Sequence, residues 1–332
     1  MPITLLLVSC ASFLNEMKDK KNRLGNTGIT VSGLCFGTLT MTPMQKNLTV
    51  KEGAALLVCA YEEGITFADT AQYYENYAYL KEALRTIPRD RYVIATKSYA
   101  WDKETARQAL DEALFALDTD YIDIFLLHEQ ESEHTLRGHA EALAYFCTMR
   151  KKGYIRATGL STHRLAGVKA ALSHEDIQII HPIVNKEGIG IPDGTMAEME
   201  TLLLQAKAQQ KGIYAMKPLG GGHLIADYNE SMRFALSRPY VDAVAVGMQS
   251  EDEVRCNAAL ARGERNLQLE EKLKKKTRKL HVAEYCIGCG ACEKRCRQGG
   301  IRVINGRAVP NDHCILCGYC AKACPEFCIK VI

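Results

Sequence analysis

The sequence predicts an α/β protein in which a (β/α)8 TIM barrel is followed by a small α+β domain rich in cysteine. From residue 22 to about residue 262, β-rich runs alternate with helical stretches, and this alternation requires parallel strands joined by helical crossovers. Nine of the 14 cysteines lie from Cys286 to Cys328. We therefore expect an N-terminal extension at 1–21, the barrel at 22–262, a basic helical linker at 263–281 and the cysteine-rich domain at 282–332.

Eight short apolar runs, most of them separated by helical stretches, match the eight units of a barrel. A doubly wound open sheet is the alternative, but it usually carries a glycine-rich turn after its first strand, whereas Gly37 is followed by Thr-Leu-Thr-Met. The expected strands are Val31–Gly37, Ile65–Ala68, Tyr92–Lys97, Tyr121–His128, Ile155–Ser161, Ile177–Val184, Ile213–Pro218 and Val241–Gly247. The expected helices include Lys103–Leu117, Gly138–Lys152 and Met196–Gln210, the last of them capped by Thr195 or Asp193.

The composition is that of an ordinary globular protein, with 47% hydrophobic and 24% charged residues. A net charge of +3 is too small to indicate a nucleic-acid partner, and no apolar run reaches the roughly 18 residues that span a bilayer. The run Ile3–Val8 with Cys10 looks like a lipoprotein cleavage box. No Lys or Arg precedes it, so we expect a loosely packed extension rather than an export signal.

The stretch from Glu270 to Lys279 reads Glu-Glu-Lys-Leu-Lys-Lys-Lys-Thr-Arg-Lys. We expect a solvated helix that joins the two domains. A basic docking face for an acidic ferredoxin is the alternative interpretation.

The clustered cysteines indicate metal ligation in a reducing compartment, and hence a cytoplasmic protein, because a secreted protein would distribute its disulfide pairs. Two runs share one spacing, Cys286-x2-Cys289-x2-Cys292-x3-Cys296 and Cys314-x2-Cys317-x2-Cys320-x3-Cys324-Pro325. This spacing resembles that of bacterial two-cluster ferredoxins, in which the fourth cysteine of each run binds the other cluster. Two zinc sites are the alternative, but zinc ribbons use two well-separated CxxC pairs.

The resemblance implies two [4Fe–4S] clusters. It gives cluster 1 the ligands Cys286, Cys289, Cys292 and Cys324, and it gives cluster 2 the ligands Cys314, Cys317, Cys320 and Cys296. Gly288, Gly290 and Gly318 fall between ligands, where the backbone must turn tightly. Cys296 departs from the pattern because Arg297, not proline, follows it, and we expect the ninth cysteine, Cys328, to be a buried apolar residue.

Polar residues end three successive strands of the expected barrel. Asp69 follows the second strand, Lys97 ends the third, and His128 ends the fourth. Because the C-terminal strand ends of a barrel share one mouth, these side chains should converge there with Tyr74 from the adjacent loop. The charge of Lys97 should lower the pKa of Tyr74, which could then protonate a carbonyl oxygen that His128 orients.

Several motifs in order resemble the aldo-keto reductases, and with the cysteine-rich tail they resemble the subgroup that carries a two-[4Fe–4S] domain. The motifs are Arg23-Leu-Gly-Asn-Thr-Gly-Ile, Asp69-Thr-Ala-x-x-Tyr74, Ala95-Thr-Lys97, Leu126-Leu-His128, Gly159-Leu-Ser161, Lys217-Pro-Leu-Gly-Gly-Gly222 and the segment from Gly247 to Asn257. The resemblance implies catalytic roles for Tyr74, Asp69, Lys97 and His128. Tyr73 is the neighbouring alternative, but the five-residue step from Asp69 favours Tyr74.

The resemblance also implies a nicotinamide site, with changes. The positions that would bind the nicotinamide carboxamide are Ser161 and Thr162, with a further contact from the sixth strand at His181 or Lys186. The position that would stack on the nicotinamide ring is Met216. Gly220, Gly221 and Gly222 could admit a pyrophosphate. The positions that would hold an NADP 2′-phosphate fall on Gly247 and Glu253, near Asn257, and a carboxylate there repels phosphate, so NADH is favoured over NADPH.

We therefore expect an oxidoreductase that reduces a small carbonyl compound or oxidises an alcohol, coupled to electron transfer through the clusters. A hydride carries two electrons while each cluster carries one, so a ferredoxin or a flavoprotein is the expected partner. The alternative is an electron-transfer protein whose barrel serves only as a docking scaffold, which the changes at Thr162, His181 and Met216 favour. The sequence does not identify the substrate.

Overall fold

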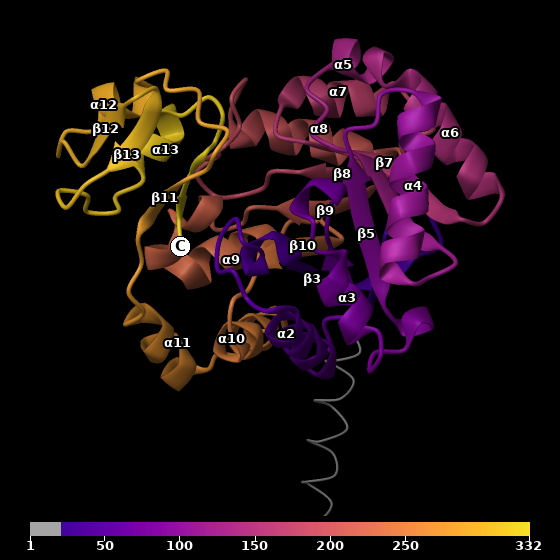
Figure 1. Cartoon of the computed structure of the whole chain (residues 1–332), viewed down its shortest axis with the longest axis horizontal. Helices are drawn as coiled ribbons and strands as arrows, with labels where there is room; N and C mark the ends of the chain where they lie inside the picture. Colours follow the sequence, from indigo (N-terminus) through magenta and orange to yellow (C-terminus); the bar gives the residue numbers. More distant parts are fainter. Residues whose placement is uncertain (1–20) are drawn as a thin grey trace, which may run out of the picture.

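The computed structural model describes residues 21–332, so the expected N-terminal extension, except for Lys21 in the first strand, lies outside the described residues. Eight parallel strands close into a barrel in sequence order, with the last strand pairing to the first (Figure 1). The barrel strands are β3 (Leu34–Gly37), β4 (Phe67–Asp69), β5 (Val93–Ser98), β6 (Ile122–Leu127), β7 (Ile155–Thr162), β8 (Ile179–Pro182), β9 (Gly212–Met216) and β10 (Ala243–Gly247). The barrel prediction is confirmed.

The first expected strand is shorter than predicted, because a bend at Gly33 separates β3 from a preceding hairpin. This hairpin pairs β1 (Lys21–Arg23) with β2 (Thr30–Ser32) in antiparallel register. Its buried residues Leu24, Ile29 and Val31 pack with Phe67 and Tyr214 in the barrel interior. The hairpin thus supplies apolar side chains to the interior of the barrel.

Helices surround the strands and leave the mouth to the connecting loops (Figure 1). Thr195 caps α8 (Met196–Ala208) by accepting a hydrogen bond from the Glu198 amide. Asp193, the alternative cap, instead accepts from the amides of Leu165 and Ala166 at the start of α7 (Leu165–Leu172). The remaining barrel helices are α2 (Val50–Glu62), α3 (Tyr77–Ala83), α4 (Lys103–Leu117), α5 (Glu133–Gly138), α6 (Ala140–Lys151), α9 (Tyr228–Leu236) and α10 (Glu251–Ala261).

The linker contains one short helix, α11 (Leu267–Lys274). Most of its charges are paired within the molecule: Lys272 with Asp252, Lys274 with Glu271, Lys276 with Glu253 and Arg265 with Glu270. Two of these pairs tie the linker to α10, so the positive charge of the linker serves largely to attach it to the barrel. No helix within residues 21–332 is long and apolar enough to cross a membrane.

The cysteine-rich domain consists of two antiparallel strand pairs and two short helices. Strand β11 (Leu280–Val282) pairs with β14 (Ile329–Val331), and β12 (Ile301–Ile304) pairs with β13 (Arg307–Pro310). Helices α12 (Ala291–Arg295) and α13 (Tyr319–Ala323) each follow a glycine with a left-handed backbone, Gly290 and Gly318. The structure thus repeats the duplication seen in the sequence.

The cysteine-rich domain packs against loops that follow β8 and β9, beside the mouth of the barrel (Figure 1). Lys322 forms an ion pair with Glu187 at 2.8 Å, and the ring of His223 lies 3.1 Å from the carbonyl oxygen of Ile329. A side chain on Gly222 would collide with the Val331 carbonyl. The domain therefore lies over the end of the barrel where active sites form.

Asp123, at the start of β6, joins three neighbouring strands at the end of the barrel opposite the site. One of its carboxylate oxygens accepts from Arg89 at 2.9 Å and from the Ile94 amide of β5 at 3.0 Å, and the other accepts from Arg156 of β7 at 2.6 Å. The Asp123 side chain is 1% exposed. Its removal would leave the partly buried guanidinium of Arg89 without a counter-charge and the buried Ile94 amide without this acceptor.

We expect Asp123→Ala to reduce the free energy of unfolding by about 2–4 kcal/mol, because a buried carboxylate that binds two partly exposed arginines and a backbone amide is lost. Asp111→Ala is the matched control, since Asp111 pairs with Arg107 on an exposed helix surface and should cost less than about 1 kcal/mol. Urea unfolding followed by circular dichroism measures both. Equal losses in the two variants would contradict this account of Asp123.

Candidate active site

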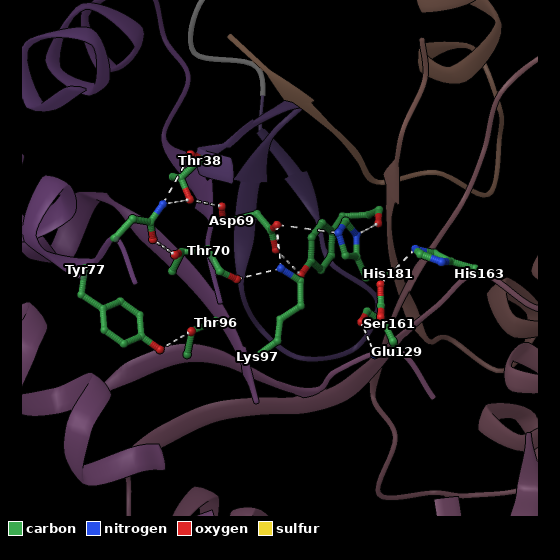
Figure 2. Close-up of polar contacts among 12 residues, drawn as sticks. Thr38, Asp69, Thr70, Tyr77, Thr96, Lys97, Glu129, Ser161, His163 and His181 are labelled. Carbon is green, nitrogen blue, oxygen red and sulfur yellow. Dashed lines mark hydrogen bonds and ion pairs between the residues drawn. The ribbon is translucent and has the colours of Figure 1, made fainter. Parts of the chain in front are cut away.

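Lys97 and Asp69 form a buried ion pair at the ends of adjacent strands. The Lys97 ammonium donates to Asp69 Oδ2 at 2.8 Å and to the Thr70 carbonyl at 2.7 Å (Figure 2). Lys97 is 1% exposed and Asp69 5%. The charge of the lysine is therefore held in one place by two fixed acceptors.

Threonine and asparagine side chains hold the loop that supplies these acceptors. Thr38 donates to the Asp69 carbonyl at 2.9 Å and accepts from the Asn76 amide at 2.8 Å, while Thr70 donates to Asn76 Oδ1 (Figure 2). All four residues are buried. The position of the Thr70 carbonyl thus depends on hydrogen bonds inside the protein rather than on solvent.

Tyr214 is a member of the site that the sequence analysis missed. Its hydroxyl donates to Asp69 Oδ1 at 2.9 Å, so both oxygens of that carboxylate are bound. His181 stacks on the Tyr214 ring with centroids 3.9 Å apart, and its Nδ1 lies 2.6 Å from the Tyr214 carbonyl. A tyrosine on the seventh strand was a usable signal, because a buried hydroxyl needs a partner.

Tyr74 lies beneath the ammonium of Lys97, which is 5.0 Å from the centre of its ring. The rings of Tyr74 and His128 meet edge to face with centroids 5.9 Å apart. The structure thus brings together all four residues of the expected tetrad. The neighbouring Tyr73 is 53% exposed, whereas Tyr74 lines a cavity.

The expected lowering of the Tyr74 pKa was wrong in its net direction. Burial raises the pKa of Tyr74 above its ordinary value, and the charge of Lys97 offsets only part of that effect. Tyr74 therefore stays protonated at neutral pH and loses its proton only as the pH rises through this raised pKa. A protonated phenol is the form that can donate to an oxygen.

His128 is buried, and its Nδ1 has no hydrogen-bond partner among the described residues. Burial holds its pKa well below the usual range, so the ring is neutral at physiological pH. Tyr99 stacks on it with centroids 4.5 Å apart, and the Tyr99 hydroxyl donates to Glu129 at 2.7 Å. A neutral ring in this position can donate one hydrogen bond without charge repulsion from Lys97.

A cavity of about 840 Å³ opens from Asp69 and Tyr74 and extends between the barrel, α11 and the cysteine-rich domain. This volume lies within the range of sites for small molecules and cofactors. His181, Met216, Gly221, Gly222, Gly247 and Asn257 of the expected nicotinamide site line it, whereas Ser161, Thr162 and Gly220 do not. The cavity thus joins the tetrad to part of the expected cofactor site.

The eight cysteines of the two runs surround two separate small cavities. One is lined by Cys286, Cys289, Cys292 and Cys324 together with the ninth cysteine, Cys328, and the other by Cys296, Cys314, Cys317 and Cys320. Gly288 between the first ligands has a φ of 64°, and backbone amides reach two of the sulfurs, from Ala308 to Cys286 and from Gly300 to Cys296. This arrangement of four thiols and amide donors fits an iron–sulfur cluster in each cavity.

A family model described as the aldo/keto reductase family matches residues 33–233, and a model described as a 4Fe-4S dicluster domain matches residues 278–325. The chain belongs to the aldo/keto reductase family. The cysteine-rich tail is a 4Fe-4S domain attached to it.

Among curated relatives of this reductase is the L-galactose dehydrogenase of Arabidopsis thaliana. It is 26% identical over 218 residues, which cover 62% of this chain and 67% of the relative. The 6-dehydroglucose reductase of Novosphingobium aromaticivorans is 26% identical over 258 residues, which cover 71% and 79%. A solved aldo-keto reductase from Bacillus halodurans superposes with a TM-score of 0.63 at 20% identity, over 77% of this chain and 95% of that one, and shows the shared fold.

In this aldo-keto reductase, the residues that the resemblance assigns to a nicotinamide have hydrogen-bond partners within the protein. Ser161 accepts from the Glu129 amide at 2.8 Å, and Thr162 exchanges hydrogen bonds with the backbone of Arg164. His181 is turned towards Asp69, which lies 3.8 Å from its Nε2. The expected carboxamide contacts thus have partners inside the protein, and the structure does not show them facing the cavity as a set.

The glycines that were expected to bind a pyrophosphate are in contact with the 4Fe-4S domain instead. A side chain on Gly221 would lie 3.0 Å from the Phe327 ring, and one on Gly222 would collide with Val331. Both glycines have positive φ, 68° and 92°. Close approach of the 4Fe-4S domain accounts for these glycines without a phosphate.

Glu253 and Asn257, which also line the cavity, have partners within the protein. Glu253 accepts from the Gln249 amide at 2.7 Å and pairs with Lys276 at 2.6 Å. Asn257 accepts from Tyr228 at 3.0 Å and donates to the Glu253 carbonyl at 2.8 Å.

Cys328 is 2% exposed, as expected for an apolar core position, and its sulfur lies 3.4 Å from that of Cys324.

We expect Tyr74→Phe to lower kcat for carbonyl reduction by roughly 10²–10⁴-fold, because the proton donor is lost. Tyr73→Phe is the matched control and should change kcat by less than about threefold, since Tyr73 is a solvent-exposed neighbour. Steady-state kinetics with an aldehyde substrate measures both. Similar losses in the two variants would exclude Tyr74 as the specific donor.

Proposed function

We propose that this aldo-keto reductase reduces a small carbonyl compound, or oxidises the corresponding alcohol, with Tyr74 as the acid or base. The observation that carries the proposal is the group formed by buried Asp69, Lys97 and His128 with partly buried Tyr74, in which Asp69 and Tyr74 line a cavity of about 840 Å³. The family acts on small carbonyl compounds, and this group supplies the proton that their reduction requires.

Each residue of the group has a distinct task in this mechanism. Tyr74 gives its proton to the carbonyl oxygen, and the Lys97 ammonium stabilises the phenolate that remains. Asp69 and the Thr70 carbonyl keep that ammonium in place. Neutral His128 orients the carbonyl oxygen through a ring N–H. A bound nicotinamide supplies the hydride in this chemistry.

We further propose that NADH is preferred over NADPH. The size of the cavity and its course from Tyr74 to Asn257 support a dinucleotide. Glu253 lines the same cavity, and its carboxylate, which is paired with Lys276, disfavours a 2′-phosphate at that position.

We infer two [4Fe–4S] clusters, held by the four cysteines of each cavity. When bound, such clusters carry one electron each. The position of the 4Fe-4S domain beside the mouth of the barrel supports a coupling of electron transfer to the barrel site. A ferredoxin or a flavoprotein partner would connect one-electron and two-electron steps.

An electron-transfer protein with a scaffold barrel is the second candidate. The packing of Phe327 and Val331 on Gly221 and Gly222 favours it, because the 4Fe-4S domain occupies a surface that was expected to bind pyrophosphate. In that case neither NADH nor NADPH would bind.

Titration of anaerobically purified protein with NADH and with NADPH decides between the two candidates. The fluorescence of the reduced dinucleotide itself reports binding. We expect micromolar binding of NADH and weaker binding of NADPH, with the difference reduced in Glu253→Gln. No binding of either dinucleotide would favour the scaffold.

For the clusters, we expect about eight iron and eight acid-labile sulfide atoms per chain. Cys324→Ser removes one ligand and should lower both contents by about half, whereas Cys328→Ser removes a cysteine outside the ligand sets and should leave both unchanged. Chemical analysis of iron and sulfide measures this. Equal loss in the two variants would contradict the ligand assignment.

A further inference from the structure

Two lysines from different domains meet in the cavity that contains Tyr74. Lys217 directly follows β9 of the barrel, and Lys330 lies on β14 of the 4Fe-4S domain. Both line the cavity together with Asp69 and Tyr74. Neither lysine has a role in the mechanism above.

Neither lysine has an acidic partner. The Lys217 ammonium bonds to His163 Nε2 at 2.7 Å, and the Lys330 ammonium donates to the Phe327 carbonyl at 2.6 Å. Within residues 21–332 no carboxylate lies at ion-pair distance from either of them, although Lys274 on the same cavity pairs with Glu271. Glu129, whose charge acts on both lysines, is itself bound by Tyr99.

Phe327 fixes both ammonium groups. Its ring centre lies 4.3 Å from the Lys217 nitrogen and 4.0 Å from the Lys330 nitrogen. The ring is anchored by close contact with Gly190 and Gly221, and Phe327 itself has a left-handed φ of 49°. These contacts attract both cations to one ring and keep their side chains within the cavity.

The two positive charges are costly without a counter-ion. Burial holds the pKa of Lys217 well below its usual range, and the charge of Lys330 lowers it further. Burial lowers the pKa of Lys330 to about 8. A bound anion would offset this cost for both lysines.

We propose that Lys217 and Lys330 form an anion subsite of the cavity that binds a phosphate or carboxylate group of the ligand. The ligand is then a carbonyl compound that carries such a group, or a dinucleotide through its diphosphate. The identity of the ligand rests on the proposed function, whereas the subsite itself does not. The 4Fe-4S domain contributes one of its two cations, so the subsite exists only in the assembled two-domain chain.

Isothermal titration calorimetry with inorganic phosphate on the anaerobically purified, cluster-loaded full chain tests the subsite without turnover. We expect Lys217→Gln and Lys330→Gln each to weaken phosphate binding by about tenfold or more, because a charge-assisted hydrogen bond is lost. Lys217→Arg keeps the charge and should retain binding. Lys274→Gln, which removes a paired lysine of the same cavity, should not change it.

Two further measurements identify the source of the anion. If the Gln variants have a higher KM than the wild type for a phosphorylated or carboxylated aldehyde but not for a neutral one, the subsite binds the substrate. If they instead have a higher Kd for NADH, the subsite binds the diphosphate. If the wild-type chain binds phosphate but reduces no carbonyl compound, the proposed function is overturned and the subsite stands.

The subsite is overturned if the wild-type chain does not bind phosphate, or if the Gln variants bind it as tightly as the wild type. A shift in cluster reduction potential with unchanged phosphate binding would show that the lysines only offset the charge of the clusters. The cluster absorption spectrum confirms folding, and Lys217→Gln alone decides the question if Lys330→Gln does not fold.

Discussion

The buried ion pair of Lys97 with Asp69 is the interaction on which the site depends. An ammonium that is 1% exposed requires compensation, and it receives a carboxylate at 2.8 Å and a backbone carbonyl at 2.7 Å. The second oxygen of Asp69 is bound by Tyr214. This arrangement leaves a fixed positive charge 5.0 Å from the ring of Tyr74, where it can stabilise a phenolate without drawing the proton away beforehand.

The 4Fe-4S domain is the second constraint on the site. Its Val331 approaches Gly222 so closely that a side chain there would collide, and its Phe327 leaves only a tight fit for a side chain on Gly221. The domain therefore forms a wall of the cavity rather than a separate module on a flexible tether. In this position the domain brings the cysteine cavities close to the loop after β9. It also adds residues of its own, such as Phe327 and Lys330, to the wall of the cavity that contains Tyr74.

Much of the architecture could be predicted, because parallel strands of a barrel are continuous apolar runs and their ends converge. The same reasoning brought together Asp69, Lys97 and His128, and cysteine spacing grouped the two sets of four thiols. The net shift of the Tyr74 pKa could not be predicted, because the sequence gives the neighbouring charge but not the depth of burial. Contacts between distant segments, such as Phe327 on Gly221 or Asp193 on α7, leave no local pattern.

A direct measurement of the protonation state of Tyr74 tests the central claim, that a partly buried tyrosine beside a fixed ammonium is a protonated acid. Nuclear magnetic resonance of protein with ¹³C-labelled tyrosine, with Tyr74→Phe to assign the signal, follows this phenol as the pH rises. The account predicts that Tyr74 remains protonated beyond the ordinary tyrosine pKa of about 10. A phenolate signal from Tyr74 at neutral pH would contradict it.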